Sequence, residues 1–205
     1  MKVGIFTFPR TTSTSLVHRI GETVALPIFE EPLTHIQAFT DKLTYVHDVI
    51  NPAMAGVFKF MNHNFLELNW QSINWKSFDK LIFLDRRNIA EACMSTYVAQ
   101  SNQVWQYYHN SIHHVIVPCE VPRQHVTDFV HGIKQFNNIK QEIVKITDSI
   151  TIFYEDYETY PTYVSSYLGI SQLTSLGPYE SSNLDYIKVC TNYDQVTNWV
   201  HLLLN

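Results

Sequence analysis

The stretch VGIFTFPRTTSTSLVHRI, residues 3–20, says more about the fold than any other part of the chain. Residues 3–8 are uncharged and rich in β-prone side chains, which predicts a buried strand. Residues 16–20 favour a helix, and a polar turn rich in hydroxyl side chains lies between the two. A buried strand that passes through a short turn into a helix is typical of α/β proteins.

The turn in this stretch has the features of an anion-binding site. Free N–H groups and the positive end of the helix dipole meet at a helix start. Arg10 adds a guanidinium that suits a phosphate or a sulfate. The hydroxyl donors are Thr11, Thr12, Ser13, Thr14 and Ser15. A purely structural role is the alternative, because Ser and Thr are also common N-cap residues. The turn lacks the glycines and lysine of the kinase loop GxxxxGK[ST].

Length and composition set limits on the class of protein. The 205 residues suffice for one domain with its own core, and 45% hydrophobic with 16% charged residues is a globular composition. The net charge of −5 and the lack of a basic run argue against a nucleic-acid partner. An anionic ligand must therefore be held by local charges and backbone donors.

The cysteines and the start of the chain bear on its compartment. Three widely spaced cysteines without a C-x-x-C pair indicate neither a disulfide framework nor a thiolate zinc site. The early strand leaves no room for a signal peptide, and no apolar run approaches the 18 or so residues of a membrane span. These features predict a soluble, cytoplasmic protein.

Alternating strand and helix patterns predict a single α/β domain over residues 1–205, with a central parallel β-sheet flanked by helices. Further strands are expected over 56–60, 80–84 and 149–154. Helices are expected over 12–24, 36–49, 89–100, 121–146, 163–168 and 194–204. The apolar stripe of residues 126–146 predicts a core-facing helix. Residues 26–34 are expected to be loop, residues 66–78 to include a helical turn, and residues 102–120 carry no clear pattern.

A second cationic position follows the strand LIFL, residues 81–84. Open α/β sheets bind ligands beyond the carboxyl ends of their strands, where Arg86 and Arg87 are expected. Ser95 follows Arg87 by eight residues, about two helical turns, so the two side chains could hold one anion. Alternatively, the arginines pair with Asp85, Glu91 or solvent.

Four short motifs together resemble the sulfotransferase family that uses 3′-phosphoadenosine 5′-phosphosulfate (PAPS). They are PRTTST at 9–14, Arg87 with Ser95 after the LIFL strand, YED at 154–156 with Pro161 and LGI at 168–170, and TNY at 191–193. The first resembles the family's 5′-phosphosulfate loop and the second its 3′-phosphate position. The matches run in the family's order and extend over residues 3–204.

The resemblance implies a P-loop, nucleotide-kinase-like α/β fold and sulfuryl transfer from PAPS to a hydroxyl or amine. Arg10 and the hydroxyl run would hold the 5′-phosphosulfate, and Arg87 and Ser95 would hold the 3′-phosphate. Tyr154 would lie near the adenine, although a strand-end tyrosine can equally line the rim of the core. The acceptor would be a small molecule, a carbohydrate or a lipid, and no metal is required.

The acceptor also needs a general base. The resemblance favours Glu31, since Glu31-Pro32 is similar to an E-P pair of some bacterial members, with His35 as the next candidate. Lys59 would lie near the transferred group. A surface or structural role is the alternative for each of these residues.

Two departures from the family pattern keep other functions open. Thr12 replaces the loop glycine. Residues 59–61 read KFM where cytosolic members have K-T-H, so the family's histidine is missing at position 61, and His63 lies two residues after that position. The alternative is a non-catalytic nucleotide-binding or scaffold protein with the same fold. A kinase-like phosphotransferase is disfavoured by the missing Gly-Lys-Ser/Thr. The sequence does not indicate the oligomeric state.

Overall fold

The computed structural model describes residues 1–9, 13–34, 36, 39–65, 68–103, 116–156, 158–173 and 185–205. The chain divides into two compact units. The first comprises Met1–Asp85 and Phe136–Gly177, and the second comprises Arg86–Gln135 and Pro178–Asn205. The single domain expected over residues 1–205 stays a prediction.

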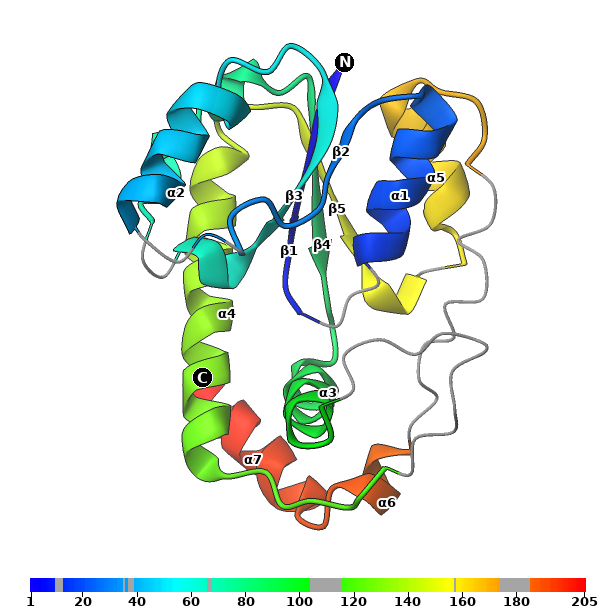
Figure 1. Cartoon of the computed structure of the whole chain (residues 1–205). Helices are drawn as coiled ribbons and strands as arrows, with labels where there is room; N and C mark the ends of the chain where they lie inside the picture. The colour runs from blue at the N-terminus through cyan, green and yellow to red at the C-terminus, as the bar shows by residue number, and fades with distance from the viewer. Residues whose placement is uncertain are drawn as a thin grey trace. The chain divides into compact units, whose positions relative to one another are not determined.

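A five-stranded, all-parallel sheet forms the centre of the first unit, which confirms the α/β class (Figure 1). The strands are β1 (Lys2–Thr7), β2 (Ile28–Phe29), β3 (Gly56–Met61), β4 (Lys80–Asp85) and β5 (Ser149–Phe153). Their order is β2-β3-β1-β4-β5. From β1 the chain continues to β2 at one edge of the sheet, and from β4 it continues to β5 at the opposite edge. The carboxyl ends of the adjacent strands β1 and β4 therefore flank a topological switch point, where ligands commonly bind.

The two faces of this sheet bury different side chains. The α1/α5 face is aliphatic, with Val3, Ile5, Val57, Ile82, Leu84 and Ile152 from the strands. Helices α1 (Ser13–Val24) and α5 (Tyr160–Leu168) pack against it (Figure 1). The opposite face is aromatic, with Phe6, Phe58, Phe60, Phe65, Trp75, Phe78, Phe83 and Phe136 in contact. Alternating strand side chains separate the two cores.

Most expected elements of the first unit are present, with shifted ends. The predicted loop over 26–34 contains β2, so the loop prediction was wrong there, because a two-residue strand has no periodicity to detect. The helix expected over 36–49 is α2 (Phe39–Tyr45), extended by a π-helical turn, Val46–Ile50. Residues 66–78 include the expected helical turns, at Trp70–Ser72 and Trp75–Ser77. Gly169 closes α5 in a left-handed conformation, with φ 66°.

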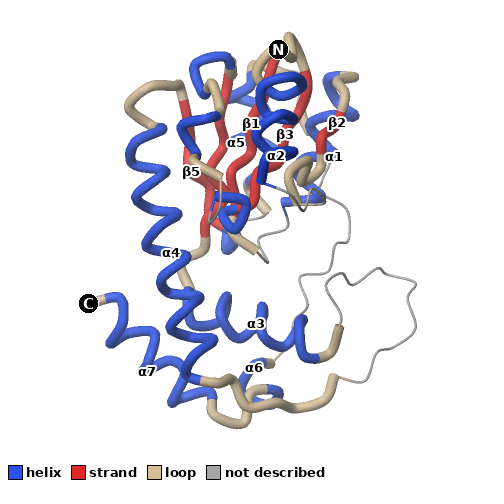
Figure 2. The backbone as a smooth tube through the Cα atoms, turned by 60° about the vertical axis from the view of Figure 1, so that its left-hand side comes forward, coloured by secondary structure: helices blue, strands red, loops and turns tan. Residues whose placement is uncertain are grey.

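Helices make up most of the second unit. Helix α3 (Ile89–Ser101) packs against α6 (Tyr186–Val189) and α7 (Tyr193–Leu204) (Figure 2). Helices α3 and α7 match the sequence prediction, whereas the four-residue α6 was too short to predict. Of the unassigned residues 102–120, residues 104–115 lie outside the described part of the chain.

Helix α4 (Arg123–Ile143) confirms the predicted core-facing stripe. The buried stripe residues are Val126, Phe129, Val130, Ile133, Phe136, Ile139 and Ile143. Ile146 is 42% exposed, because the helix ends three residues before it and the 3.6-residue period no longer applies. Among the described residues, no helix is long and apolar enough to cross a membrane.

Candidate functional site

Candidate side chains from three neighbouring segments of the first unit meet near the carboxyl edge of its sheet. Thr14 lies in the first turn of α1, which follows β1, and Glu30 and Glu31 directly follow β2. Lys59 lies on β3, two residues before that strand ends. Open α/β sheets bind their ligands at this edge.

Lys59 is the centre of the site. It is only 2% exposed, and its Nζ donates hydrogen bonds to Thr14 Oγ1 at 2.7 Å and to Glu31 Oε1 at 2.6 Å. Glu30 Oε1 lies 3.6 Å from the same Nζ. A buried ammonium is costly unless it is paired. The two carboxylates therefore allow a lysine to occupy a strand position that faces an aliphatic core.

Glu30 links Lys59 to helix α1. Its Oε1 accepts a hydrogen bond from Thr14 Oγ1 at 2.9 Å, and its Oε2 lies 3.0 Å from His18 Nε2. Burial alone would raise the pKa of Glu30, but the hydrogen bonds to His18 and Thr14 and the charge of Lys59 outweigh it and lower that pKa. Thr14, His18, Glu30, Glu31 and Lys59 are called the Lys59 cluster below.

The local sequence explains how the Lys59 cluster forms. Gly21 brings α1 close to β2, since a Cβ at that position would lie 2.3 Å from Ile28 Cγ1. Thr14 and His18 are four residues apart and share the helix face above Glu30. Glu31 has φ 49°, a left-handed conformation that is rare for a residue with a side chain. Such strain costs about 1–3 kcal/mol and is concentrated at functional sites.

His63 adds an imidazole close to this edge. It follows β3, and its Nε2 lies 3.4 Å from Thr34 Oγ1, which also accepts a hydrogen bond from Asn64 Nδ2 at 3.2 Å. Burial lowers the pKa of His63, the charges of Lys42 and Lys59 lower it further, and the carboxylate of Glu31 opposes them. His63 therefore lies close enough to Glu31, the predicted general base, for the charge of Glu31 to act on it.

The remaining candidates of the first unit are placed less closely together. Ser13 and Ser15 are buried in the first turn of α1. Tyr154 begins a 3-10 turn directly after β5 and is half-buried. Four candidates lie outside the described residues, namely Arg10, Thr11, Thr12 and His35.

Arg87 and Ser95 belong to the second unit. Arg87 is exposed and precedes Asn88, whose side chain caps α3 by accepting a hydrogen bond from the Glu91 N–H. Ser95 lies in α3 and is 3% exposed. Nη2 of the neighbouring Arg86 lies 3.8 Å from Oε2 of Glu91. This ion pair is one of the alternative roles that the sequence analysis gave for the two arginines.

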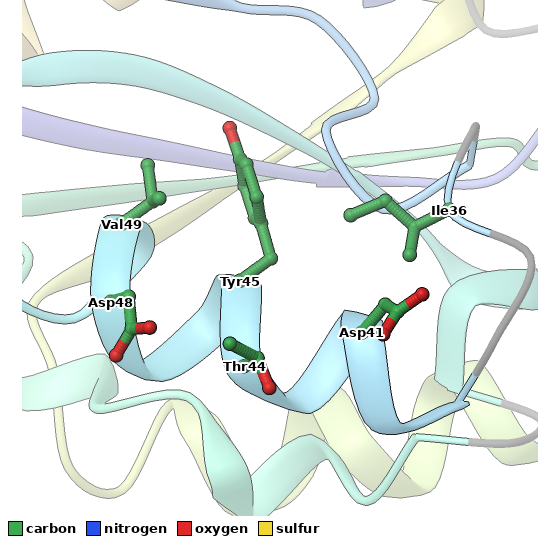
Figure 3. Close-up of a pocket in the computed structure, with 6 residues that line it drawn as sticks. All are labelled: Ile36, Asp41, Thr44, Tyr45, Asp48 and Val49. Carbon is green, nitrogen blue, oxygen red and sulfur yellow. The ribbon is translucent and has the colours of Figure 1, made fainter.

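A separate open pocket of about 420 Å³ lies along α2 and the π-helical turn. Its lining residues are Ile36, Asp41, Thr44, Tyr45, Asp48 and Val49. Figure 3 shows Ile36 facing the helical residues from the preceding segment. Asp41 and Asp48 give the pocket negative charge, which disfavours a polyanionic nucleotide. We therefore do not place a nucleotide in it.

The Lys59 cluster combines two chemical groups that group transfer needs. Lys59 supplies a fixed positive charge beside the helix start, and Glu31 supplies a carboxylate held in one orientation. The sequence singled out Thr14, Glu31 and Lys59 separately, and the structure brings them into contact. It did not single out His18, although the four-residue spacing from Thr14 on a predicted helix was a usable signal.

Comparisons with models of known protein families and with curated protein sequences both find no match.

The lowered pKa of Glu30 predicts an acid-dependent loss of stability. A carboxyl whose pKa is lower in the folded state stabilises the fold above its unfolded pKa, about 4.3, and loses that contribution as the pH falls through the folded value. Glu30→Gln removes this titration. We therefore expect the free energy of unfolding to fall less for the variant than for the wild type between pH 6 and pH 3, measured by urea unfolding. Equal losses in both proteins would contradict this role of Glu30.

Proposed function

We propose that this protein is a transferase of anionic groups that binds a nucleotide at the carboxyl edge of its parallel sheet. More specifically, we propose a sulfotransferase that moves a sulfuryl group from PAPS to a hydroxyl or amine. The proposal rests on the order and spacing of the four family-like motifs. The contact of Lys59 with Thr14 and Glu31 supports it most directly, because it joins the proposed phosphosulfate loop to the proposed base.

The donor groups at the start of α1 fit a phosphosulfate. Ser13, Thr14 and Ser15 stand at the beginning of a 12-residue helix, where N–H groups and the helix dipole favour an anion. In this proposal residues 9–15 act as a P-loop-like phosphate-binding loop, with the Arg10 guanidinium on the anion. PAPS would supply the activated sulfuryl group.

The remaining residues have separate roles in this proposal. Lys59 stabilises negative charge that develops beside the helix start, and Glu31 accepts the proton of the acceptor hydroxyl or amine. Arg87 and Ser95 bind the 3′-phosphate that distinguishes the donor from other adenine nucleotides, and Tyr154 contacts the adenine. His63 and His35 are the other groups available on the acceptor side.

Two measurements test this function in sequence. Titration calorimetry compares 3′-phosphoadenosine 5′-phosphate with ATP, and we expect tight binding of the first and none of the second. Transfer is then screened with labelled PAPS against carbohydrates, lipids, amines and phenols. Binding without transfer to any acceptor would favour the non-catalytic alternative, and absence of selective binding would overturn the nucleotide assignment itself.

Arg87→Ala is expected to weaken binding of 3′-phosphoadenosine 5′-phosphate by about 10–100-fold, because a charge-assisted hydrogen bond contributes about 1.5–3 kcal/mol. Binding of adenosine 5′-phosphosulfate, which lacks the 3′-phosphate, should change little. Lys145→Ala is the matched control, since it removes one exposed positive charge from an i,i+3 pair outside the proposed site. If Arg87→Ala weakens both nucleotides equally, Arg87 does not read the 3′-phosphate.

A further inference from the structure

All three cysteines of this chain lie in the second unit, although they are far apart in the sequence. Cys93 is buried in α3, Cys190 is buried between α6 and α7, and Cys119 is half-buried in the segment that precedes α4. All three are free thiols. The part of the chain that the structure describes has no group of three or more His, Cys, Asp or Glu arranged for a metal ion. Thiol chemistry is therefore the property to consider.

Cys119 and Cys190 face each other in an isolated parallel β-bridge. The Cys119 N–H donates to the Val189 carbonyl oxygen at 2.9 Å, and the Thr191 N–H donates to the Cys119 carbonyl oxygen at 3.1 Å. Residues directly opposite each other in a β-pair project their side chains to the same face. The pairing thus directs both thiols to one side of the bridge.

A second set of hydrogen bonds fixes the register of this pairing. The Asn192 side chain accepts from the Val121 N–H at 3.0 Å and donates to the Val121 carbonyl oxygen at 3.0 Å. Asn192 therefore binds Val121 as a paired backbone would, two residues beyond the cysteines on both segments. A slip of one residue would break both of these bonds, so the two cysteines are held opposite each other.

The separation of the two segments suits a covalent link. Neighbouring paired strands lie about 4.8 Å apart, and a disulfide joins Cα atoms separated by roughly 4.4–6.8 Å. Each thiol also influences the pKa of the other, as neighbouring side chains do. Little backbone movement is needed to bring the sulfur atoms to bonding distance.

We propose that Cys119 and Cys190 are a redox-reactive pair that closes to an intramolecular disulfide in the presence of a small-molecule disulfide such as oxidised glutathione. The Cys119 thiolate attacks one glutathione sulfur and releases one glutathione thiol. The Cys190 sulfur, after losing its proton to water, then attacks the Cys119 sulfur and releases the second glutathione thiol. Two protein thiols are oxidised, one disulfide is reduced, and two glutathione molecules leave.

The environments of the two thiols set the order of these steps. Burial raises the pKa of both, to about 12 for Cys190, while a hydrogen bond from Cys190 opposes the rise at Cys119. Because the thiolate is the nucleophile, the half-buried Cys119 reacts first, and Cys190, only 1% exposed, resolves the mixed disulfide. The reaction is therefore slower than at an activated catalytic cysteine. Cys93, fully buried and with a pKa of about 12, stays reduced.

Closing the disulfide ties together the two pieces of the second unit, residues 86–135 and 178–205. A cross-link between distant parts of the chain reduces the entropy of the unfolded state and commonly stabilises the fold. For a chain of this size we expect the midpoint of thermal unfolding to rise by roughly 5–10 °C on oxidation. Reduction with dithiothreitol should reverse the shift.

The test incubates the native 205-residue protein with oxidised glutathione, blocks the remaining thiols at low pH, and analyses non-reduced peptides by mass spectrometry. Digestion combines trypsin with chymotrypsin, because no Lys or Arg lies between Cys93 and Cys119. We expect the number of free thiols to fall from three to one, with one peptide pair linked through Cys119 and Cys190. Cys93→Ala is the matched control and should still form this link. Cys119→Ser should lose it and show no thermal shift, while its circular dichroism spectrum reports whether it is folded.

Three results would each overturn the proposal. They are three free thiols after incubation in excess oxidised glutathione, a link that involves Cys93 in place of either partner, and a stable glutathione adduct on Cys119 that Cys190 does not resolve. Should Cys119→Ser fail to fold, the wild-type peptide map and the Cys93→Ala protein still decide among these outcomes.

Discussion

Replacing Glu31 by glutamine is expected to lower the rate of the proposed sulfuryl transfer by about 10²–10⁴-fold, the usual contribution of a general base. Glutamine keeps an oxygen that can accept the 2.6 Å hydrogen bond from Lys59 Nζ, but it cannot take a proton from the acceptor. Binding of 3′-phosphoadenosine 5′-phosphate should change little, because the loss falls on the chemical step. The rate is measured with labelled PAPS and whichever acceptor the transfer screen identifies.

Glu30→Gln is the matched control for this prediction. It also removes one carboxylate from beside Lys59, since Glu30 Oε1 lies 3.6 Å from Nζ, but Glu30 binds Thr14 and His18 of helix α1. We expect its rate to fall by no more than about 10-fold, through loss of positioning. Equal losses in the two variants would mean that the charge of the Lys59 cluster matters and that Glu31 is not the base. His63→Gln then becomes the next variant to measure.

Patterns that repeat along the chain could be predicted from the sequence. Apolar runs gave four of the five strands, because a buried parallel strand is a continuous apolar segment. The stripe on α4 gave its buried face, because it follows the helical period. The two-residue β2 and the four-residue α6 were missed, because such short elements depend on contacts with distant parts of the chain.

In the candidate site, too, some residues could be identified from the sequence, whereas the contacts between them could not be predicted. Hydroxyl groups at the expected helix start directed attention to Thr14, and the resemblance of Glu31-Pro32 to an E-P pair of the family directed attention to Glu31. That Lys59 Nζ contacts both could not be predicted, because the contact depends on the pairing of β2 with β3 and on the close approach of α1 at Gly21. The register of Cys119 with Cys190 is likewise a long-range property, and an odd cysteine count gave no hint of it.

Replacing Lys59 by methionine is expected to cost about 2–4 kcal/mol of folding stability at pH 7. Removing one partner of a buried ion pair usually costs 3–5 kcal/mol, but Glu30 and Glu31 keep 34% and 25% of their side-chain surface exposed, so water compensates in part. Without Lys59, the two neighbouring carboxylates repel each other, and the pKa of Glu30, which the charge of Lys59 helps to lower, rises. The stability deficit of the variant should therefore shrink as the pH falls from 7 toward 4. Urea unfolding at several pH values measures it.

A double-mutant cycle separates the ion pair from simple packing. If the Lys59–Glu31 contact is the dominant interaction, adding Glu31→Gln to the Lys59→Met variant should restore at least about 1 kcal/mol of folding stability. The reason is that Glu31→Gln removes one of the two uncompensated negative charges. Val57→Ala is the packing control, since Val57 lies on the same face of β3 and carries no charge, and its effect should add to that of Glu31→Gln. A deficit that is constant with pH, together with additive effects of Lys59→Met and Glu31→Gln, would show that Lys59 only fills space. In that case Lys59 would not be the charged centre on which the proposed transfer chemistry depends.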